Sequence, residues 1–478
     1  MRRVLLALAV FLVALALRVD VRREVPPFDD LYHLKRIHYS AAHLPRVLAF
    51  DRDRGVTGLF CPWPPLYDLG CALFVRATGA TSDAAIDARL RWLPPIGYAL
   101  FAALVSWLVA RSCVAAPRPL LAAATAGFVL ALAPWLIAIS RSASIDHHWA
   151  ESMLVLPIVY ATRQRRGVLL GVAIVAALFV QTALLAAVAL AFAAIFLFDA
   201  EPRFAAVGFG LAAATVLLWR IAQPAGYPDN PWFLGWPHAA ALVAACVACA
   251  LSKRRVVALA AGVACLLPFL PAIVRGVHFF GGDPWLSRIV EFQPMFHHLD
   301  RLGTDVANIG GAAVLAFVVA RRERAVALFA IAYLALAISS SRFLVPAIPL
   351  FALAAALAVA RARTSRGALA ACALALAAPL AYDAYAVTQP WPRDDAPRAL
   401  AMRVRPLAPG RVLAPWWAGH AIDVIGRHPV VIDNFGSMPD AQLFDEAQRA
   451  LAARDFAWCR AHGVRWLIDD RLRIWPVE

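Results

Sequence analysis

Two adjacent carboxylates, Asp29 and Asp30, follow closely on the first apolar run of the chain. An aromatic ring, an imidazole and two cations come next, at Tyr32, His33, Lys35 and Arg36. Such a group does not belong inside a bilayer, so we expect it at the membrane surface. Carboxylates placed there can hold a divalent cation. The plainer alternative is that the pair caps the helix predicted to begin at Leu31.

A carboxylate and an imidazole recur two residues apart, as Asp146 and His148. In an extended loop this spacing allows both to bind one divalent cation, and Arg141 could meet an anion beside it. Interfacial anchoring of a helix end is the alternative, and it explains Trp149 but not Asp146. The segment therefore favours a second part of a cation site.

Two weaker signals stand later, at Glu291 and Arg342. A single Glu in a long loop is ordinarily a solvated charge, and Arg342 could either reach to the interface or bind a lipid pyrophosphate as a fixed cation. Three carboxylates from three separate segments, with a basic partner, predict a metal–diphosphate site better than any of them does singly.

The composition indicates which elements must position these groups. Of 478 residues, 62% are hydrophobic and 16% are charged, and the mean hydropathy is +0.67. These values are typical of a polytopic α-helical membrane protein. The net charge is +15, and most of the Lys and Arg residues lie in short gaps between apolar runs. Membrane topology therefore explains the charge more simply than nucleic-acid binding does.

Thirteen membrane helices are predicted from the apolar runs and their flanking cations. The run from 168 to 198 is too long for a single span of about 20 residues, and the flanking arginines all face the cytoplasm only if it crosses twice, turning near Gln181 and Thr182. The N-terminus is then cytoplasmic. The other runs are 4–18, 92–110, 119–139, 149–162, 204–221, 238–251, 256–274, 307–320, 325–338, 344–360 and 367–386.

This topology divides the chain into a membrane domain, 1–386, and an extracytoplasmic tail, 387–478. The longer polar segments all fall on the outer side, at 19–91, 140–148, 222–237 and 275–306. The tail alternates short apolar runs with a helical pattern, which predicts a small α/β domain. Its predicted elements are strand-like runs at 411–414, 429–432 and 464–468 and a helix within 440–462.

In this order the motifs resemble those of the catalytic subunit of oligosaccharyltransferase, in the GT-C class of membrane glycosyltransferases. Asp29 to His33 are similar to the family's first acidic motif, and Asp146-His147-His148 reproduces its D-H-H form. Glu291 matches the glutamate of a later motif, and Arg342 matches an arginine that contacts the lipid diphosphate. The resemblance implies a GT-C fold of 13 membrane helices with an extracytoplasmic active site and C-terminal domain.

The resemblance also implies roles for these residues. Mg²⁺ or Mn²⁺ would be bound by Asp29, Asp146, His148 and Glu291, three of which, Asp29, Asp146 and Glu291, would also be catalytic. Arg342 and Arg141 would hold the polyprenyl-diphosphate donor. Asp30 competes with Asp29 for the metal, and we favour Asp29 because its spacing to His33 and Arg36 matches the family.

One motif departs from the family pattern. Where the family has W-W-D-Y-G, this chain has Trp416, Trp417, Ala418, Gly419 and His420, so the carboxylate that reads the hydroxyl of an N-x-S/T sequon is missing. Trp416, Trp417 and His420 remain candidates for substrate binding. The expected acceptor is therefore a protein side chain, whether asparagine or another, or a glycan.

Three other functions are compatible with parts of this pattern. A GT-C transferase could use a polyprenyl-monophosphate sugar, and a non-catalytic relative could bind glycolipid through its tail. A glycolipid transporter would require ionisable or helix-breaking features at mid-membrane depth. Here the charges cluster at the outer ends of the helices, which favours a glycosyltransferase.

Overall fold

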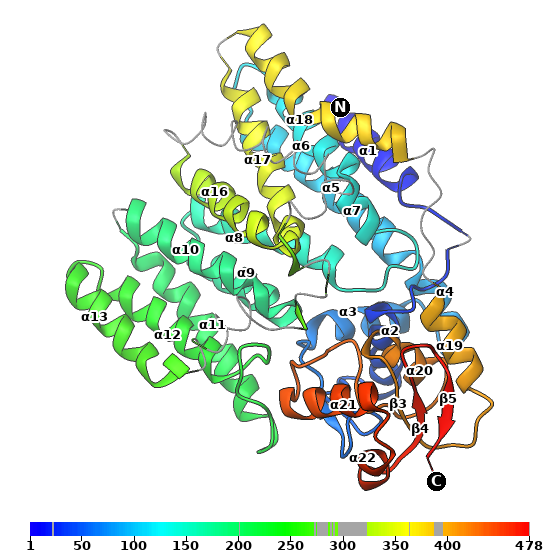
Figure 1. Ribbon diagram of the computed structural model, residues 1–478. Helices are drawn as coiled ribbons and strands as arrows, with labels where there is room; N and C mark the ends of the chain where they lie inside the picture. The colour runs from blue at the N-terminus through cyan, green and yellow to red at the C-terminus, as the bar shows by residue number, and fades with distance from the viewer. Residues whose placement is uncertain are drawn as a thin grey trace.

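The computed structural model describes residues 1–21, 23–199, 201–271, 274, 285, 286, 289, 292–294, 323–362, 364–386 and 395–477. Within these residues, apolar helices build a large bundle, and the C-terminal residues form a small α/β layer that lies against one end of it (Figure 1). Helices that are apolar around their whole circumference are either buried or exposed to lipid. The bundle is therefore that of an integral membrane protein.

The bundle contains one helix that is surrounded by others. α17, which follows the 3₁₀ turn Ser341–Phe343, is 89% buried over its most apolar window, whereas the outer helix α11 is 33% buried. The described helices of the bundle are α1 (Arg2–Ala16), α5 (Leu93–Ser112), α6 (Pro119–Leu132), α7 (Pro134–Ile139), α8 (His148–Arg163), α9 (Gly167–Val180), α10 (Leu185–Phe198), α11 (Arg203–Ile221), α12 (Trp236–Ala250), α13 (Arg255–Leu266), α16 (Arg324–Ser339), α17 (Leu344–Arg361) and α18 (Ser365–Ala386).

The long apolar run at 168–198 is broken where the sequence predicts a turn. α9 ends at Val180, a 3₁₀ turn covers Thr182–Leu184, and α10 begins at Leu185. In the described part of the chain, three helical stretches are long and apolar enough to cross a bilayer alone, namely Asp83–Ser112, Arg203–Ile221 and Ser341–Arg361. The predicted run 307–320 lies outside the described residues, so the total of 13 helices stays a prediction.

The first connecting segment, residues 19–91, is itself folded. Asp29 and Asp30 stand in the first turn of α2 (Asp29–His43), which packs along α3 (Leu66–Ala77). Acidic side chains in a first turn stabilise the helix through its dipole, but neither aspartate caps it: the helix begins two residues before the predicted Leu31, and Phe28 precedes it without a side-chain cap. The segment also contains the antiparallel strands β1 (Phe50–Asp51) and β2 (Leu59–Phe60) and the helix α4 (Asp83–Leu90).

The C-terminal residues 395–477 form a three-stranded sheet with helices beside it. The strand order is β3-β4-β5, with β3 parallel and β5 antiparallel to the central β4. The elements are α19 (Ala396–Val404), β3 (Arg411–Leu413), α20 (Gly419–Val424), α21 (Ala441–Ala453), α22 (Phe456–Ala461), β4 (Val464–Ile468) and β5 (Ile474–Pro476).

Two predicted elements of this region differ from the structure. The helix expected within 440–462 is split, because Arg454 adopts a left-handed conformation and Asp455 caps a new helix, α22. The run 429–432 makes isolated bridges in place of a regular strand, since Val430 pairs with Val412 and with Arg54. The strands predicted at 411–414 and 464–468 are confirmed as β3 and β4.

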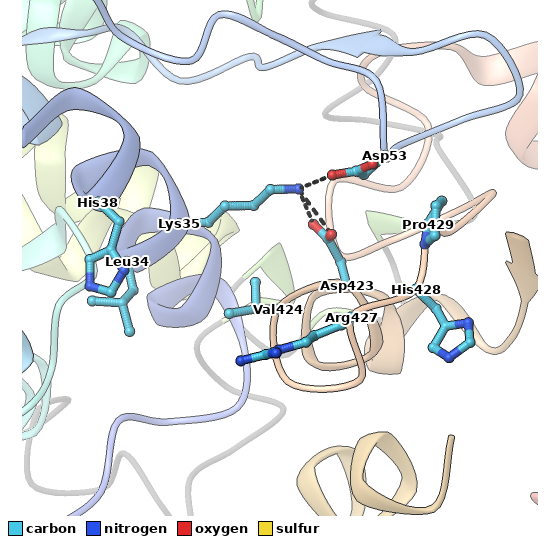
Figure 2. A pocket seen from close by; sticks show the side chains of 9 residues that line it. All are labelled: Leu34, Lys35, His38, Asp53, Asp423, Val424, Arg427, His428 and Pro429. Carbon is cyan, nitrogen blue, oxygen red and sulfur yellow. Dashed lines mark hydrogen bonds and ion pairs between the residues drawn. The ribbon is translucent and has the colours of Figure 1, made fainter. Parts of the chain in front are cut away.

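Buried ion pairs fix the C-terminal region to the first connecting segment. The guanidinium of Arg54 binds the carboxylate of Asp433 through two nitrogens, one of them at 3.1 Å, and both residues are buried. The ammonium of Lys35 lies 2.9 Å from both oxygens of Asp423 and borders a cavity of 340 Å³ between α2 and α20 (Figure 2). The polar end of α2 is thereby held against the C-terminal region.

Candidate active site

Asp146 lies in the segment between α7 and α8 and reaches the start of α2. Its backbone N–H donates to Oδ1 of Asp30 at 3.1 Å. Burial raises the pKa of Asp30 to about 7, with the charge of Asp146 adding to the effect and Arg23 opposing it. The two carboxylates that belong to different parts of the sequence are therefore held side by side.

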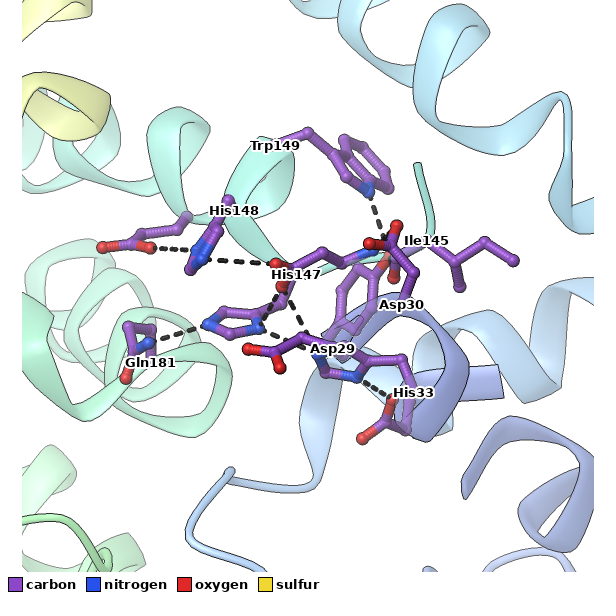
Figure 3. A network of polar contacts seen from close by, with 12 residues as sticks. Asp29, Asp30, His33, Ile145, His147, His148, Trp149 and Gln181 are labelled. Carbon is purple, nitrogen blue, oxygen red and sulfur yellow. Dashed lines mark hydrogen bonds and ion pairs between the residues drawn. The ribbon is translucent and has the colours of Figure 1, made fainter. Parts of the chain in front are cut away.

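The imidazoles of His33 and His147 lie next to each other (Figure 3), and both face Oδ1 of Asp146. Nδ1 of His147 lies 2.8 Å from this oxygen, and Nε2 of His33 lies 3.5 Å from it. The two nitrogens are 2.9 Å apart. These three atoms, from α2 and from the segment before α8, form a triangle of potential metal ligands.

The far side of each ring is held by another polar group. Nδ1 of His33 donates to Oδ1 of Asp68 at 2.7 Å, and the indole of Trp63 stacks on the His33 ring at 3.9 Å. Nε2 of His147 lies 2.7 Å from the amide of Gln181, at the break between α9 and α10. Both histidines are buried, so their orientations are fixed by these contacts.

The surroundings shift the pKa values of the two histidines in opposite directions. Burial disfavours the charged form of His33, but the carboxylates of Asp68 and Asp146 outweigh it and raise its pKa to about 9. Burial lowers the pKa of His147 to about 4, although Asp146 opposes the shift. At neutral pH and without a metal, the pair therefore carries one positive charge, on His33, whereas His147 is neutral.

Oδ2 of Asp146 faces a second group of charged residues. It lies 3.3 Å from Nε2 of His148, and Nη1 of Arg342 lies 2.8 Å from the same nitrogen. Nδ1 of His148 is 3.0 Å from Oε2 of Glu151, which also accepts from Nη2 of Arg342 at 3.3 Å. A guanidinium only donates hydrogen bonds, so Nε2 of His148 is the acceptor and its Nδ1–H donates to Glu151.

Asp29 faces the C-terminal region instead of Asp146. Its side chain is 35% exposed, and its Oδ1 lies 3.4 Å from Nδ1 of His420, which is 0% exposed. The ring of His420 stacks on Tyr32 at 4.9 Å. Gly419, the residue before His420, lets the start of α20 lie against residues 432–433, because a Cβ there would be 2.6 Å from the backbone oxygen of Ile432.

The structure brings together three of the predicted site residues, Asp146, His148 and Arg342. Glu291 lies outside the described residues, but the next two residues are placed near Arg342. The backbone N–H of Ser341 donates to the carbonyl of Gln293 at 3.0 Å, and the guanidinium of Arg342 lies 5.8 Å from the centre of the Phe292 ring.

The other predicted residues lie farther out or contact different groups. Arg141 is in the same segment as Asp146, between α7 and α8. Trp416 packs edge-on against Trp285 at 6.0 Å in the core of the C-terminal region. Trp417 packs against a neighbouring apolar cluster that contains Val412 and Ile422.

Sequence reasoning assigned no role to five polar residues of this site, which are His33, His147, Glu151, Asp68 and Gln181. A signal for Glu151 was present, because His148 and Glu151 are spaced i, i+3 at the start of a helix and must share a face. Asp68 gave no signal of its own, and Gln181 was predicted only as part of a turn; the packing of α3 along α2, and of α9 beside α3 and α8, brings them to the histidines.

Comparisons with known proteins identify the architecture. No model of a protein family matches the chain, and a search of curated proteins finds no match. Solved structures do match. The fold is that of archaeal oligosaccharyltransferase AglB. The complex of AglB from Archaeoglobus fulgidus with an inhibitory peptide and a dolichol-phosphate superposes with a TM-score of 0.74 at 16% identity, covering 98% of this chain and 69% of that chain.

Two further structures of the Archaeoglobus fulgidus oligosaccharyltransferase agree with this result. One is tethered to an acceptor peptide containing the NVT sequon, with a TM-score of 0.69 at 17% identity over 97% of this chain and 68% of that one. The other is a complex with Zn and sulfate, with a TM-score of 0.67 at 17% identity and the same coverage. At such identities the likeness to AglB establishes the fold.

Proposed function

We propose that this chain is a membrane glycosyltransferase that transfers a glycan from a polyprenyl-diphosphate lipid to an acceptor at the extracytoplasmic face. The observation that supports this most strongly is the position of Asp146. Its carboxylate lies between the His33–His147 pair and the His148–Arg342 pair. Groups suited to a metal and to an anion thus adjoin one carboxylate in a fold like that of AglB.

The donor set fits a divalent cation. Oδ1 of Asp146 is buried and accepts no hydrogen bond within the described residues, and an uncompensated buried carboxylate oxygen is costly. We propose Asp146, His148 and Glu291 as ligands of Mg²⁺ or Mn²⁺; Asp29, the fourth predicted ligand, faces His420 in this structure and is proposed for the acceptor instead. When bound, such an ion would neutralise charge that develops on the departing diphosphate.

Arg342 would bind the diphosphate. Its side chain is 11% exposed, and its orientation is fixed by His148 and Glu151. A guanidinium held in place binds phosphate oxygens without the entropy cost of ordering a long side chain. Arg141, in the neighbouring segment, is the proposed second cation.

Asp29 would act on the acceptor. In the transfer, the bond between the anomeric carbon and the diphosphate oxygen breaks, and the electron pair leaves with the diphosphate. The acceptor nucleophile forms the new bond to that carbon, and its proton passes to the half-exposed carboxylate of Asp29 acting as general base.

The acceptor itself would be read by the C-terminal region. Trp416 and Trp417 are proposed to face it, whereas His420 is completely buried, so its influence would pass through Asp29. Because the family's aspartate and tyrosine are replaced, the proposed acceptor is a protein side chain or a glycan other than a strict N-x-S/T sequon.

The donor class is tested with purified protein in lipid nanodiscs. Synthetic lipids carrying one labelled sugar through a diphosphate or through a monophosphate are offered with Mn²⁺ and a mixture of acceptor peptides and glycans. The proposal predicts transfer from the diphosphate lipid only, and its loss on chelation. Transfer from the monophosphate lipid alone would replace this function with the monophosphate-dependent one.

A further inference from the structure

We propose that Nε2 of His33, Nδ1 of His147 and Oδ1 of Asp146 form a zinc-preferring site. This deepens the proposed function, because it adds two ligands, His33 and His147, to the metal site proposed above and makes Zn²⁺ a further candidate, beside Mg²⁺ and Mn²⁺, for the ion bound there. It rests on that function only for the use of the ion. Whether the ion binds is a property of these three side chains.

The three atoms already have the separations of ligands on one ion. The distances between them are 2.8, 2.9 and 3.5 Å. Ligands about 2.0–2.2 Å from a common zinc ion stand roughly 3–3.5 Å apart. A small adjustment of the His147 ring therefore suffices to admit the ion.

The outer contacts of His33 direct its free electron pair into the triangle. Asp68 only accepts hydrogen bonds when ionised, so the Nδ1–H of His33 donates to it at 2.7 Å and leaves Nε2 as the ligand. A carboxylate behind a metal-binding histidine is a recurrent arrangement that fixes the ring and makes it a stronger ligand. The guanidinium of Arg36 lies 2.5 Å from the other oxygen of Asp68 and forms a buried ion pair with it.

Gln181 can play the same part for His147. Its side-chain nitrogen lies 2.7 Å from Nε2 of His147, while its oxygen accepts from the backbone N–H of Ala183 and from the hydroxyl of Thr182, each at 3.4 Å. Turning the amide by half a turn exchanges its oxygen and nitrogen and gives up only these two long contacts. With the oxygen facing the ring, Nε2–H of His147 donates to Gln181. Nδ1 is then the ligand, and it faces Nε2 of His33.

A proton shared by the two rings would not complete this arrangement. It would join the nitrogens at 2.9 Å but leave the buried Oδ1 of Asp146 without a well-aligned donor in the described part of the chain, even though Nδ1 of His147 lies 2.8 Å from it. A divalent cation satisfies all three atoms at once. Two imidazoles and one carboxylate suit Zn²⁺, whereas Mg²⁺ prefers six oxygens.

X-ray absorption at the zinc edge tests the ligand set on the unaltered protein. The full chain is stripped with a chelator, loaded with one equivalent of Zn²⁺ in nanodiscs, and measured without donor or acceptor. We expect at least two imidazole ligands, and we expect two to remain in His148→Gln. One imidazole in the wild type, or a drop to one in His148→Gln, would overturn the proposal.

Competition with a chromophoric chelator tests the individual side chains. Zinc affinity should fall at least 100-fold in His147→Ala and about 10- to 100-fold in Gln181→Leu, which removes only a contact behind the ring. His38→Gln is the matched control, because His38 lies on α2 as His33 does but pairs with Asp87. Wild-type affinity in His147→Ala would contradict the proposal.

These outcomes are separable from those of the proposed function. Zinc bound by two imidazoles in a protein that transfers no glycan would overturn the function alone. Glycan transfer with Mn²⁺ or Mg²⁺ by a protein that binds no zinc through His147 would overturn the site alone.

Discussion

At the scale of single residues, the two oxygens of Asp146 have different neighbours. Oδ1 faces His33 and His147, and Oδ2 faces His148, which is held by Glu151 and Arg342. One carboxylate therefore connects a nitrogen-rich group with a group that contains a fixed cation. The chemistry proposed for this chain depends on that connection.

Glu151 should affect the rate of transfer by positioning His148 and Arg342, without touching the substrate. Glu151→Gln keeps the shape of the side chain but weakens its hold on the Nδ1–H of His148 and on Arg342. We expect kcat to fall about 10- to 100-fold, with an unchanged melting temperature, in the nanodisc transfer assay.

The control for this variant is Glu201→Gln, because the Glu201 side chain is 81% exposed and contacts Arg165 far from the site. Equal kcat values for Glu151→Gln and the wild type would show that Glu151 does not position His148 or Arg342 for the reaction.

Asp423 should make the stability of the chain depend on pH. Burial raises its pKa from 3.8 to about 7, with Lys35 opposing and Asp51 adding to the shift. Between about pH 4 and 7 the folded state therefore keeps a proton that the unfolded state has lost, and stability falls as the pH rises.

Asp423→Asn cannot ionise, so it should not show this loss of stability. The melting temperature of the variant minus that of the wild type should therefore be several degrees higher at pH 8 than at pH 5. Thermal scans at these pH values measure the difference. Asp445→Asn, at an exposed position of α21, is the control, and a pH-independent difference for Asp423→Asn would contradict the assignment.

At the scale of elements, α9 and α11 approach closely because glycines line their contact. A Cβ at Gly208 would lie 2.6 Å from the backbone oxygen of Gly167 and 3.1 Å from the backbone nitrogen of Gly171. Small residues let membrane helices pack backbone to backbone. This contact fixes α9, whose C-terminal end is followed by Gln181.

Gly208→Val should therefore separate the two helices and lower the melting temperature by at least 5 °C, since overpacking of a tight contact costs about 1–3 kcal/mol. Gly210→Ala is the control, because a Cβ there meets only the sulfur of Cys246 at 3.4 Å. Equal melting temperatures for both variants would contradict the packing argument.

The contact between the C-terminal region and the first connecting segment depends on the buried pair of Arg54 and Asp433. Arg54→Met leaves a buried, unpaired carboxylate, which costs about 3–5 kcal/mol. We expect faster proteolysis of residues 395–477 in this variant.

The double variant Arg54→Met/Asp433→Leu removes both charges and should recover most of the lost resistance. Arg220→Met, whose partner Asp229 is largely exposed, should have little effect. A double variant no more resistant than Arg54→Met would mean that the pair is not what holds the C-terminal region.

At the scale of the whole molecule, the sequence predicted the helical bundle, the break at Gln181 and two strands of the C-terminal region, because apolar length and alternation are local signals. It also predicted that Asp146, His148 and Arg342 meet. It could not predict that Asp68 and Gln181 stand behind the histidines, since those contacts depend on how α3 packs along α2 and how α9 packs beside α3 and α8. The break at Arg454 was missed because a left-handed arginine has no distinctive pattern.

The most direct test of the account measures the fate of the donor. A polyprenyl-diphosphate lipid carrying a labelled glycan is incubated with the wild type and with Asp146→Ala, and both the transferred glycan and the released polyprenyl diphosphate are counted. We predict equal amounts of the two products from the wild type and at least a 100-fold loss of both in Asp146→Ala. Undiminished transfer by Asp146→Ala would contradict the central claim.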